Sequence, residues 1–175
     1  MDPLAKLLRP KKLEEVFGQE HILTHQQALL RNGSFILWGP PGCGKTTIAR
    51  IIGEQPGIRF FAISAVYDGI AELRKVFRQA EEVSLLTSKS ILFVDEIHRF
   101  NRGQQDALLS AIEEGLLRLI GATTENPSFS LNAALLSRTQ VLTLKPLDDN
   151  ALESCLLYTS PSPRDATLSR MPSSA

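Results

Sequence analysis

The stretch GPPGCGKTT, residues 39–47, stands between two apolar runs, SFILW at 34–38 and IARII at 48–52. It contains the pattern G-x-x-x-x-G-K-[ST], whose positions are filled by Gly39, Gly44, Lys45 and Thr46. This pattern surrounds nucleotide phosphates with backbone N–H groups. Glycines permit the tight curl of such a loop, and the helix expected behind it adds the positive end of its dipole. The stretch therefore predicts a strand, a phosphate-binding loop and a helix in direct succession.

Every residue of this loop is a candidate nucleotide contact. The expected contacts are Gly39, Pro40, Pro41, Gly42, Cys43, Gly44, Lys45, Thr46 and Thr47. In the pattern, the lysine reaches the terminal phosphates and the threonine hydroxyl holds magnesium, so we expect these roles of Lys45 and Thr46. Cys43 fills a free position, where a small tolerated side chain is a better interpretation than a redox role.

The composition is that of an ordinary globular domain. The chain has 175 residues, 43% hydrophobic and 22% charged, with 19 basic and 19 acidic side chains. No apolar run approaches the roughly 18 residues that suggest a membrane span, and the start MDPLAKLLRPKK lacks the apolar core of a signal peptide. We therefore expect a cytoplasmic protein. The neutral total gives no general basic patch, so any DNA contact would come from local clusters or from parts outside this chain.

Apolar runs and helical spacing alternate along the chain. Strands are predicted at 34–38, 58–63, 90–96, 117–122 and 140–144, and helices at 45–53, 68–86, 104–114 and 132–137. Strands separated by helices form βαβ units, which predicts an α/β fold: a five-stranded parallel sheet with helices on both faces. The first residues indicate a cationic arm and a short amphipathic helix, followed by a surface connection from His25 to Ser34.

Two acids end the run SILFVDE at 90–96. The carboxyl ends of parallel strands form the edge at which open α/β sheets bind ligands, so Asp95 and Glu96 are expected beside the phosphate loop. There Asp95 would orient magnesium and Glu96 would accept a proton from the attacking water. Taken alone, the pair could equally start a surface loop; the upstream phosphate loop favours the functional interpretation.

Polar residues also follow the next predicted strand, as TTEN at 123–126. At the end of a strand next to the acidic one they could touch the γ-phosphate or the attacking water. An ordinary strand-to-helix turn is the alternative, and the residues alone favour it slightly.

Three segments together resemble an AAA+ ATPase. GPPGCGKTT at 39–47, ILFVDEIHRFN at 91–101 and LIGATTENPSFSLNAALLSR at 119–138 look like its Walker A, Walker B and sensor 1 to arginine-finger segments. With the opening PLAKLLRPKKLEEVFGQEHIL at 3–23, they resemble the replication-associated recombination protein A family, bacterial relatives of the eukaryotic Werner-helicase-interacting ATPase. The resemblance covers residues 2 to about 147 and implies a P-loop AAA+ nucleotide-binding core with ATP and Mg²⁺ as ligands.

The resemblance assigns roles to single residues. Lys45 and Thr46 correspond to the phosphate and magnesium ligands, Asp95 to a magnesium ligand and Glu96 to the catalytic base.

Further roles concern the later segment and the amino-terminal one. Thr124 looks like sensor 1, with Thr123 as the near alternative. Arg138 looks like the arginine finger offered to a neighbouring subunit's ATP, which implies a homo-oligomer. The segment 9–19 is similar to the stretch that walls the adenine pocket. In clamp loaders a cysteine comes directly after the finger arginine, whereas Thr139 follows Arg138 in this sequence. This difference weakens the assignment to clamp loaders more than it weakens the assignment of Arg138 as the finger.

The implied function is ATP hydrolysis in a replication and recombination factor that acts at stalled or gapped forks. Its implied partners are forked, gapped or single-stranded DNA and replication proteins. A Holliday-junction branch-migration motor and a clamp-loader subunit share much of the site and are the alternatives. For the 175-residue chain itself, a nucleotide-binding module without turnover is a further alternative, because a finger acts across a subunit boundary.

From residue 155 the composition changes to CLLYTSPSPRDATLSRMPSSA, which is rich in serine and proline and has no periodicity. Such a composition predicts disorder. Back-translated, CLLYTSPSPRD also fits the read-through of a transposase-based sequencing adapter, and SRMPSSA fits the flow-cell primer. We therefore expect an ATPase core at 1–146, the start of a truncated helical lid at 147–154, and a disordered, adapter-derived tail at 155–175 that adds nothing to the fold.

Overall fold

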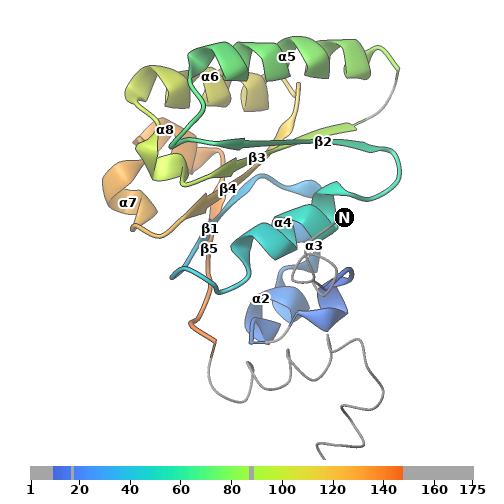
Figure 1. Ribbon diagram of the computed structural model, residues 1–175, viewed down its shortest axis with the longest axis vertical. Coiled ribbons are helices and arrows are strands. Elements are labelled where there is room, and N and C mark those ends of the chain that lie inside the picture. The colour runs from blue at the N-terminus through green and yellow to red at the C-terminus, as the bar shows by residue number, and fades with distance from the viewer. Residues whose placement is uncertain (1–9, 17, 87–88, 148–175) are drawn as a thin grey trace, which may run out of the picture.

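The computed structural model describes residues 10–16, 18–86 and 89–147 (Figure 1). In chain order the elements are η1 (Leu13–Glu15), α2 (Glu20–His25), α3 (Gln27–Asn32), β1 (Phe35–Trp38), α4 (Lys45–Gly53), β2 (Ile58–Ser64), α5 (Ile70–Ser84), β3 (Lys89–Asp95), η2 (Ile97–Arg99), α6 (Arg102–Glu113), β4 (Arg118–Thr123), α7 (Pro127–Ser130), α8 (Ala133–Ser137) and β5 (Gln140–Thr143). The predicted strands and the four predicted helices are all present, with ends within two residues of those expected.

The five strands form one sheet in the order β2-β3-β4-β1-β5, and every pair of neighbours is parallel. The predicted α/β fold with a five-stranded parallel sheet is confirmed. Because β4 lies between β1 and β3, the residues that follow β4 come between the phosphate loop after β1 and the acids after β3. This order positions the site described below.

Helices cover both faces of the sheet, as Figure 1 shows: α4 lies on one face with α2 and α3, and α5 and α6 lie on the other. Successive residues of each strand point to opposite faces. On β1, Phe35 and Leu37 join the core beneath α4, whereas Ile36 joins the core beneath α5 and α6. Both faces of the sheet are therefore apolar, which explains why the sequence of these strands is a continuous apolar run rather than an alternating pattern.

The start of α6 shows why the sequence folds this way locally. Asn101 Oδ1 accepts a hydrogen bond of 2.9 Å from the Gln104 N–H, and Gln104 Oε1 accepts one of 2.9 Å from the Asn101 N–H. This capping box satisfies amide groups that the first turn of a helix leaves without partners. It begins α6 right behind the acidic segment and so limits the length of the turn that follows β3.

The amino-terminal region is more ordered than expected. We predicted one short helix and then a surface connection from His25 to Ser34, but the chain forms α2 and then α3 there. Leu30 of α3 is fully buried, and the guanidinium of Arg118 on β4 donates hydrogen bonds of 2.7–3.1 Å to the carbonyl oxygens of Leu30, Arg31 and Gly33. These hydrogen bonds come from a residue far away in the sequence, so a short local pattern could not reveal them.

Some expectations lie outside the described residues. The predicted lid start at 147–154 falls there except for Leu147, and so does the whole predicted tail at 155–175. Within the described ranges, the structure contains no helix with the length and apolar character that crossing a membrane requires.

Candidate active site

A pocket of about 600 Å³ opens at the carboxyl ends of the central strands. It is lined by Pro41, Gly42, Gly44, Lys45, Thr46, Thr47, Asp95, Glu96 and Thr124. These residues come from three segments, after β1, β3 and β4. The structure thus brings together most of the site residues predicted from the sequence.

The phosphate loop has the backbone geometry that its glycines allow. Gly42 has φ +78° and Gly44 has φ +102°, values that other residues rarely adopt. Helix α4 begins directly afterwards at Lys45, and its N-cap, Gly44, provides no side-chain hydrogen bond to the first turn. The amide groups of that turn face the end of the loop and suit an anion.

Lys45 is buried at the base of the loop. Its Nζ donates hydrogen bonds to the carbonyl oxygens of Gly39 at 2.6 Å and Pro40 at 2.9 Å. The side chain of Cys43 is 1% exposed and packs into the core beneath α4. Of the predicted loop contacts, Gly39, Pro40 and Cys43 therefore do not line the pocket; they hold Lys45 or the loop in place.

The acid pair lies across the pocket from the loop. Strand β3 ends at Asp95, whose Oδ1 accepts a hydrogen bond of 3.0 Å from the Glu96 N–H. Glu96 has φ 53° and ψ 45°, the left-handed conformation, and it is the one residue other than glycine with positive φ in the described part of the chain. The strand therefore turns sharply at Glu96, and the two carboxylates leave the backbone in different directions.

The two threonines after β4 differ in position. Thr124 lines the pocket, and its hydroxyl lies 3.5 Å from Glu96 Oε2, a long hydrogen bond. Thr123 is fully buried and does not line the pocket; its hydroxyl contacts His98 instead. The placement supports Thr124 over Thr123 as the residue that could meet a ligand.

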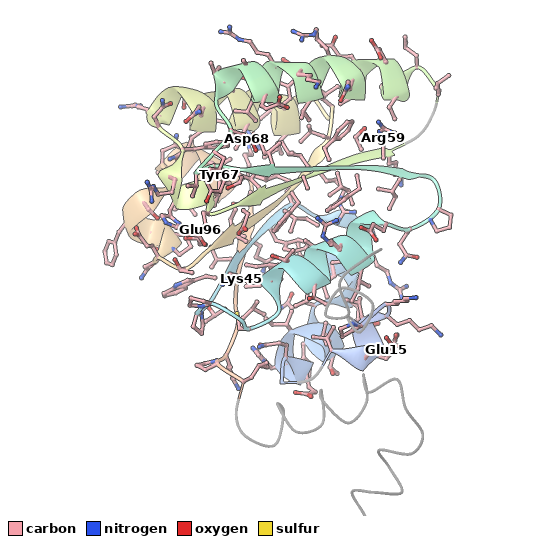
Figure 2. All side chains as sticks on the ribbon, viewed as in Figure 1. Glu15, Lys45, Arg59, Tyr67, Asp68 and Glu96 are labelled. Carbon is pink, nitrogen blue, oxygen red and sulfur yellow. The ribbon has the colours of Figure 1, made fainter. Side chains whose placement is uncertain are left out.

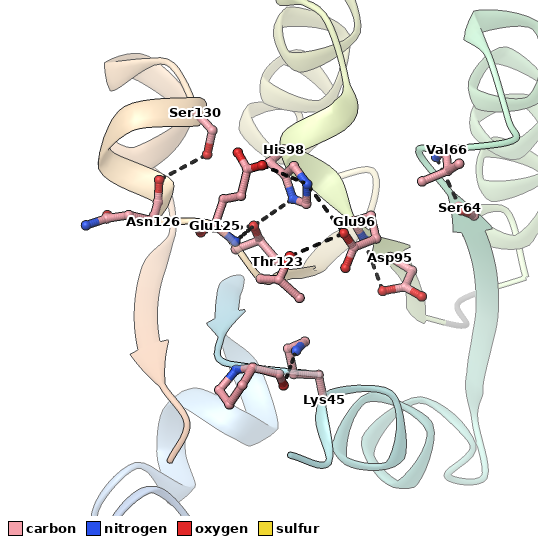
Figure 3. Close-up of polar contacts among 12 residues, drawn as sticks. Lys45, Ser64, Val66, Asp95, Glu96, His98, Thr123, Glu125, Asn126 and Ser130 are labelled. Carbon is pink, nitrogen blue, oxygen red and sulfur yellow. Dashed lines mark hydrogen bonds and ion pairs between the residues drawn. The ribbon is translucent and has the colours of Figure 1, made fainter. Parts of the chain in front are cut away.

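His98 is a site residue that the sequence reasoning did not single out, although it lies in the quoted segment ILFVDEIHRFN. Its side chain is 5% exposed, and its Nε2 lies 3.3 Å from Glu96 Oε2 (Figure 3). The signal that could have identified it is a histidine two residues after an acid pair, between the apolar residues Ile97 and Phe100.

Arg138 is not part of this pocket. It follows α8, its side chain is 57% exposed, and its Nη2 lies 2.9 Å from Glu113 Oε2 at the end of α6. Lys45 at the start of α4 and Glu96 after β3, both labelled in Figure 2, line the pocket, whereas Arg138 does not. The structure therefore places Arg138 outside the pocket that the other predicted catalytic residues line.

The amino-terminal segment is tied to the phosphate loop by Gln19, which is fully buried. Its Nε2 donates to the carbonyl oxygens of Cys43 at 3.1 Å and Lys145 at 2.7 Å, and its Oε1 accepts from the Lys145 N–H at 3.0 Å. A methyl group placed on Gly44 would meet Val16 Cγ1 at 3.9 Å. Val16 and Gln19, in the segment predicted to wall an adenine pocket, therefore lie against the loop.

The donor set fits a magnesium–nucleotide complex. Mg²⁺ binds oxygen ligands, usually one or two from the protein together with phosphate oxygens and water. The Thr46 hydroxyl and the Asp95 carboxylate both line the pocket, and the buried ammonium of Lys45 supplies positive charge. Burial lowers the pKa of one guanidinium, that of Arg118, but this residue caps α3 and lies outside the pocket.

The sequence profile of the ATPase family associated with various cellular activities (AAA) matches residues 35–147, which include every residue of this pocket. The chain belongs to this family of nucleotide-binding ATPases, as its motifs indicated.

Comparison with curated relatives shows which group of AAA ATPases the chain resembles. The chain is 51% identical over 160 residues to the replication-associated recombination protein A of Coxiella burnetii and 47% identical over 160 residues to that of Escherichia coli K12. Each comparison covers 88% of this chain and 36% of the relative. ATPase WRNIP1 of Dictyostelium discoideum is 45% identical over 163 residues, which are 90% of this chain and 19% of that protein. The predicted resemblance to the replication-associated recombination protein A family is confirmed, and the chain spans 36% of the length of these bacterial relatives.

A solved structure supports the same fold. The Thermotoga maritima RuvB Holliday junction branch migration motor has a TM-score of 0.71 and 30% identity, covering 87% of this chain and 53% of that chain. This identity is lower than the identity to the replication-associated recombination proteins, so the branch-migration alternative fits less well.

Proposed function

We propose that the pocket binds ATP with Mg²⁺ and that the full-length gene product hydrolyses ATP. The observation that carries the proposal is the convergence of Lys45, Thr46, Asp95, Glu96 and Thr124 on one pocket, from segments up to 79 residues apart. Positioning and electrostatic stabilisation supply most of the catalysis in phosphoryl transfer. The pocket contains a group for each of these tasks.

Each side chain would have one task. Lys45 and the amide groups at the start of α4 neutralise and orient the phosphates. Thr46 and Asp95 hold Mg²⁺, which supplies charge neutralisation on the phosphate oxygens when bound. Glu96 orients the attacking water and accepts its proton, and Thr124, beside Glu96, contacts the water or the terminal phosphate.

The first test replaces the proposed base. Glu96→Gln keeps the size of the side chain but removes its basicity, so the full-length gene product should bind ATP as before and lose turnover by about 10²–10⁴-fold. A titration with fluorescent nucleotide and a phosphate-release assay measure the two properties separately. Glu114→Gln, at an exposed position behind α6, is a matched control that should change neither. Unimpaired turnover of Glu96→Gln would reject Glu96 as the base.

The biological setting is proposed from the relatives: an ATP-driven factor that acts on DNA at stalled or gapped replication forks. The support is the identity of 45–51% to proteins named for replication-associated recombination and WRNIP1. The same phosphate-release assay distinguishes the alternatives when gapped, forked and four-way-junction DNA are added in turn. Stimulation by gapped or forked DNA agrees with the proposal, whereas stimulation by four-way junctions alone would favour a branch-migration motor.

The position of Arg138 favours a second proposal about assembly. Because this arginine lies outside its own pocket, turnover would need a neighbouring copy that supplies it, as in other ATPases with a finger in trans. An isolated copy would then bind nucleotide without turnover. Titration and phosphate release over a range of protein concentrations test this: binding should be independent of concentration, and turnover per subunit should rise with it.

A further inference from the structure

His98 lies where three segments meet. It belongs to η2, which follows the acid pair, and its ring packs between Glu96, Thr123 at the end of β4, and Glu125 (Figure 3). Its Nδ1 is 2.8 Å from Thr123 Oγ1, while its Nε2 is 3.3 Å from Glu96 Oε2 and 3.7 Å from Glu125 Oε2. Thr123 is fully buried and the His98 side chain is 5% exposed, so water has little access to the contact between these two residues.

The hydrogen bonds can run in one direction through this cluster. The Glu125 N–H donates to Thr123 Oγ1 at 3.0 Å, which uses the hydroxyl as an acceptor. The hydroxyl has one hydrogen to donate and two acceptors within reach, Nδ1 of His98 at 2.8 Å and the carbonyl oxygen of Glu125 at 3.0 Å. Donation to the nearer acceptor, Nδ1, continues the series toward Glu96. A neutral imidazole that accepts at Nδ1 carries its hydrogen on Nε2, and this hydrogen points to Glu96 Oε2. In this arrangement the Glu125 N–H, the Thr123 hydroxyl and the His98 Nε2–H each donate one hydrogen bond, and the last of them reaches the Glu96 carboxylate.

The carboxylate of Glu96 needs such support. Its side chain is 30% exposed, and its backbone has the left-handed conformation. Among the described residues, its other hydrogen bond comes from the Thr124 hydroxyl at 3.5 Å, which is long for a hydroxyl donor, whose usual distance is about 2.7–2.8 Å. A general base must be within hydrogen-bonding reach of the water from which it takes a proton. A carboxylate held only by the long hydrogen bond from Thr124 would have a poorly fixed orientation for that proton transfer.

We propose that His98 is a positioning residue: with Thr123 behind it, it holds the Glu96 carboxylate toward the pocket. The proposal rests on the proposed function of Glu96 as the base. Through His98, the residues after β4, which lie between the phosphate loop and the acids, would influence the orientation of the Glu96 carboxylate. His98 itself does not line the pocket, so it acts through Glu96.

The test compares variants of the full-length gene product by kcat, KM for ATP and the Kd for nucleotide. His98→Leu removes both nitrogens and should lower kcat at least about tenfold while the nucleotide Kd changes less than about twofold, because the phosphate loop is untouched. His98→Gln keeps an N–H donor near the place of Nε2 and should recover most of the lost kcat. An unchanged kcat in His98→Leu, or no difference between the two variants, would overturn the proposal.

Two further comparisons separate positioning from folding. Thr123→Val removes the hydroxyl at nearly constant volume, and Thr123→Ser keeps it; only the first should lower kcat. If the cluster acts as one unit, His98→Leu with Thr123→Val should be no slower than His98→Leu alone within about twofold, whereas multiplied losses would refute it. If His98→Leu fails to fold, as circular dichroism would show, the Thr123 pair carries the same test.

The Glu96→Gln background distinguishes this inference from the proposed function. Adding His98→Leu to Glu96→Gln should not lower the residual turnover further, because the residue that His98 positions is already disabled. Retained turnover in Glu96→Gln alone would reject the proposed base, and the inference with it. Lost turnover in Glu96→Gln together with unchanged kcat in His98→Leu would reject the inference alone.

Discussion

At the scale of single residues, Glu96 has an unfavourable backbone conformation within the candidate active site. A residue with a side chain loses about 1–2 kcal/mol in the left-handed conformation. Glu96 adopts it with φ 53°, directly after a strand that is buried from Ser90 to Val94. The conformation turns the chain so that the two adjacent carboxylates diverge, which supports separate tasks for Asp95 and Glu96.

This cost can be measured by comparing glycine with alanine at the same position. Glu96→Gly should be more stable than Glu96→Ala by about 1 kcal/mol, because glycine alone tolerates positive φ and both variants lose the same side chain. At exposed Arg78 within α5 the order should reverse, with the glycine variant less stable by about 1 kcal/mol. Urea denaturation of this chain, followed by the fluorescence of its single tryptophan, Trp38, measures each difference. A glycine variant at 96 that is the less stable of the two would contradict the strain.

At the scale of elements, the helix behind the phosphate loop is held against the sheet by a close approach at its far end. Gly53 is the last residue of α4, and a Cβ added there would overlap the ring of Phe60 on β2. That ring cannot move freely, since it stacks on Phe93 of β3 with centroids 6.5 Å apart and lies beneath the guanidinium of Arg50 at 5.8 Å. The close packing of α4 on the sheet therefore depends on the absence of a side chain at Gly53.

Gly53→Ala should destabilise the chain by about 1–3 kcal/mol, the usual cost of overpacking a core. Gly103→Ala is the matched control, because Gly103 lies in the first turn of α6 and an added Cβ would meet only Asn101 Oδ1, at 3.5 Å. That variant should be as stable as the original or more stable by up to about 1 kcal/mol, since alanine is the better helix former. Urea denaturation provides the comparison, and equal stability of both variants would show that Phe60 has room to move.

At the scale of the whole molecule, the pocket and the candidate finger are separated. The pocket lies at the carboxyl ends of β1, β3 and β4, while Arg138 follows α8 and pairs with Glu113 on the surface. Two surface charges at 57% and 42% exposure form a weak pair, typically up to about 1 kcal/mol, so Arg138 can leave Glu113 at little cost. The arrangement supports an active site completed between two copies.

Arg138→Ala in the full-length gene product should leave the nucleotide Kd unchanged and lower turnover by about 10³-fold or more. Mixing it with Glu96→Gln subunits should restore part of the turnover, because an intact base and an intact finger then meet at some interfaces. Arg74→Ala, at an exposed position on α5, is the control and should behave as the original. No recovery in the mixture would show that Arg138 does not act across subunits.

Much of the fold and part of the site could be predicted because the signals are local. The stretch 39–47 follows a strand and opens a helix, and α4 has the bounds Lys45–Gly53 that the sequence predicted. Asp95 and Glu96 end an apolar run, and the rule that ligands bind at the carboxyl ends of parallel strands was enough to bring them to the loop. Backbone geometry and hydrophobic periodicity depend on near neighbours, so the sequence alone determined the five strands, the four predicted helices and the phosphate loop.

The remaining features depend on contacts between segments far apart in the chain, and only the tertiary structure decided them. Gln19 meets Lys145 from 126 positions away, and Arg118 caps α3 from 85 to 88 positions away. His98 reaches Thr123 over 25 positions because β4 lies next to β3, a strand order that no single segment encodes. A buried polar side chain is stable only with its partner in place. For that reason the residue types show which side chains could act, and the packing of the sheet determines which of them meet.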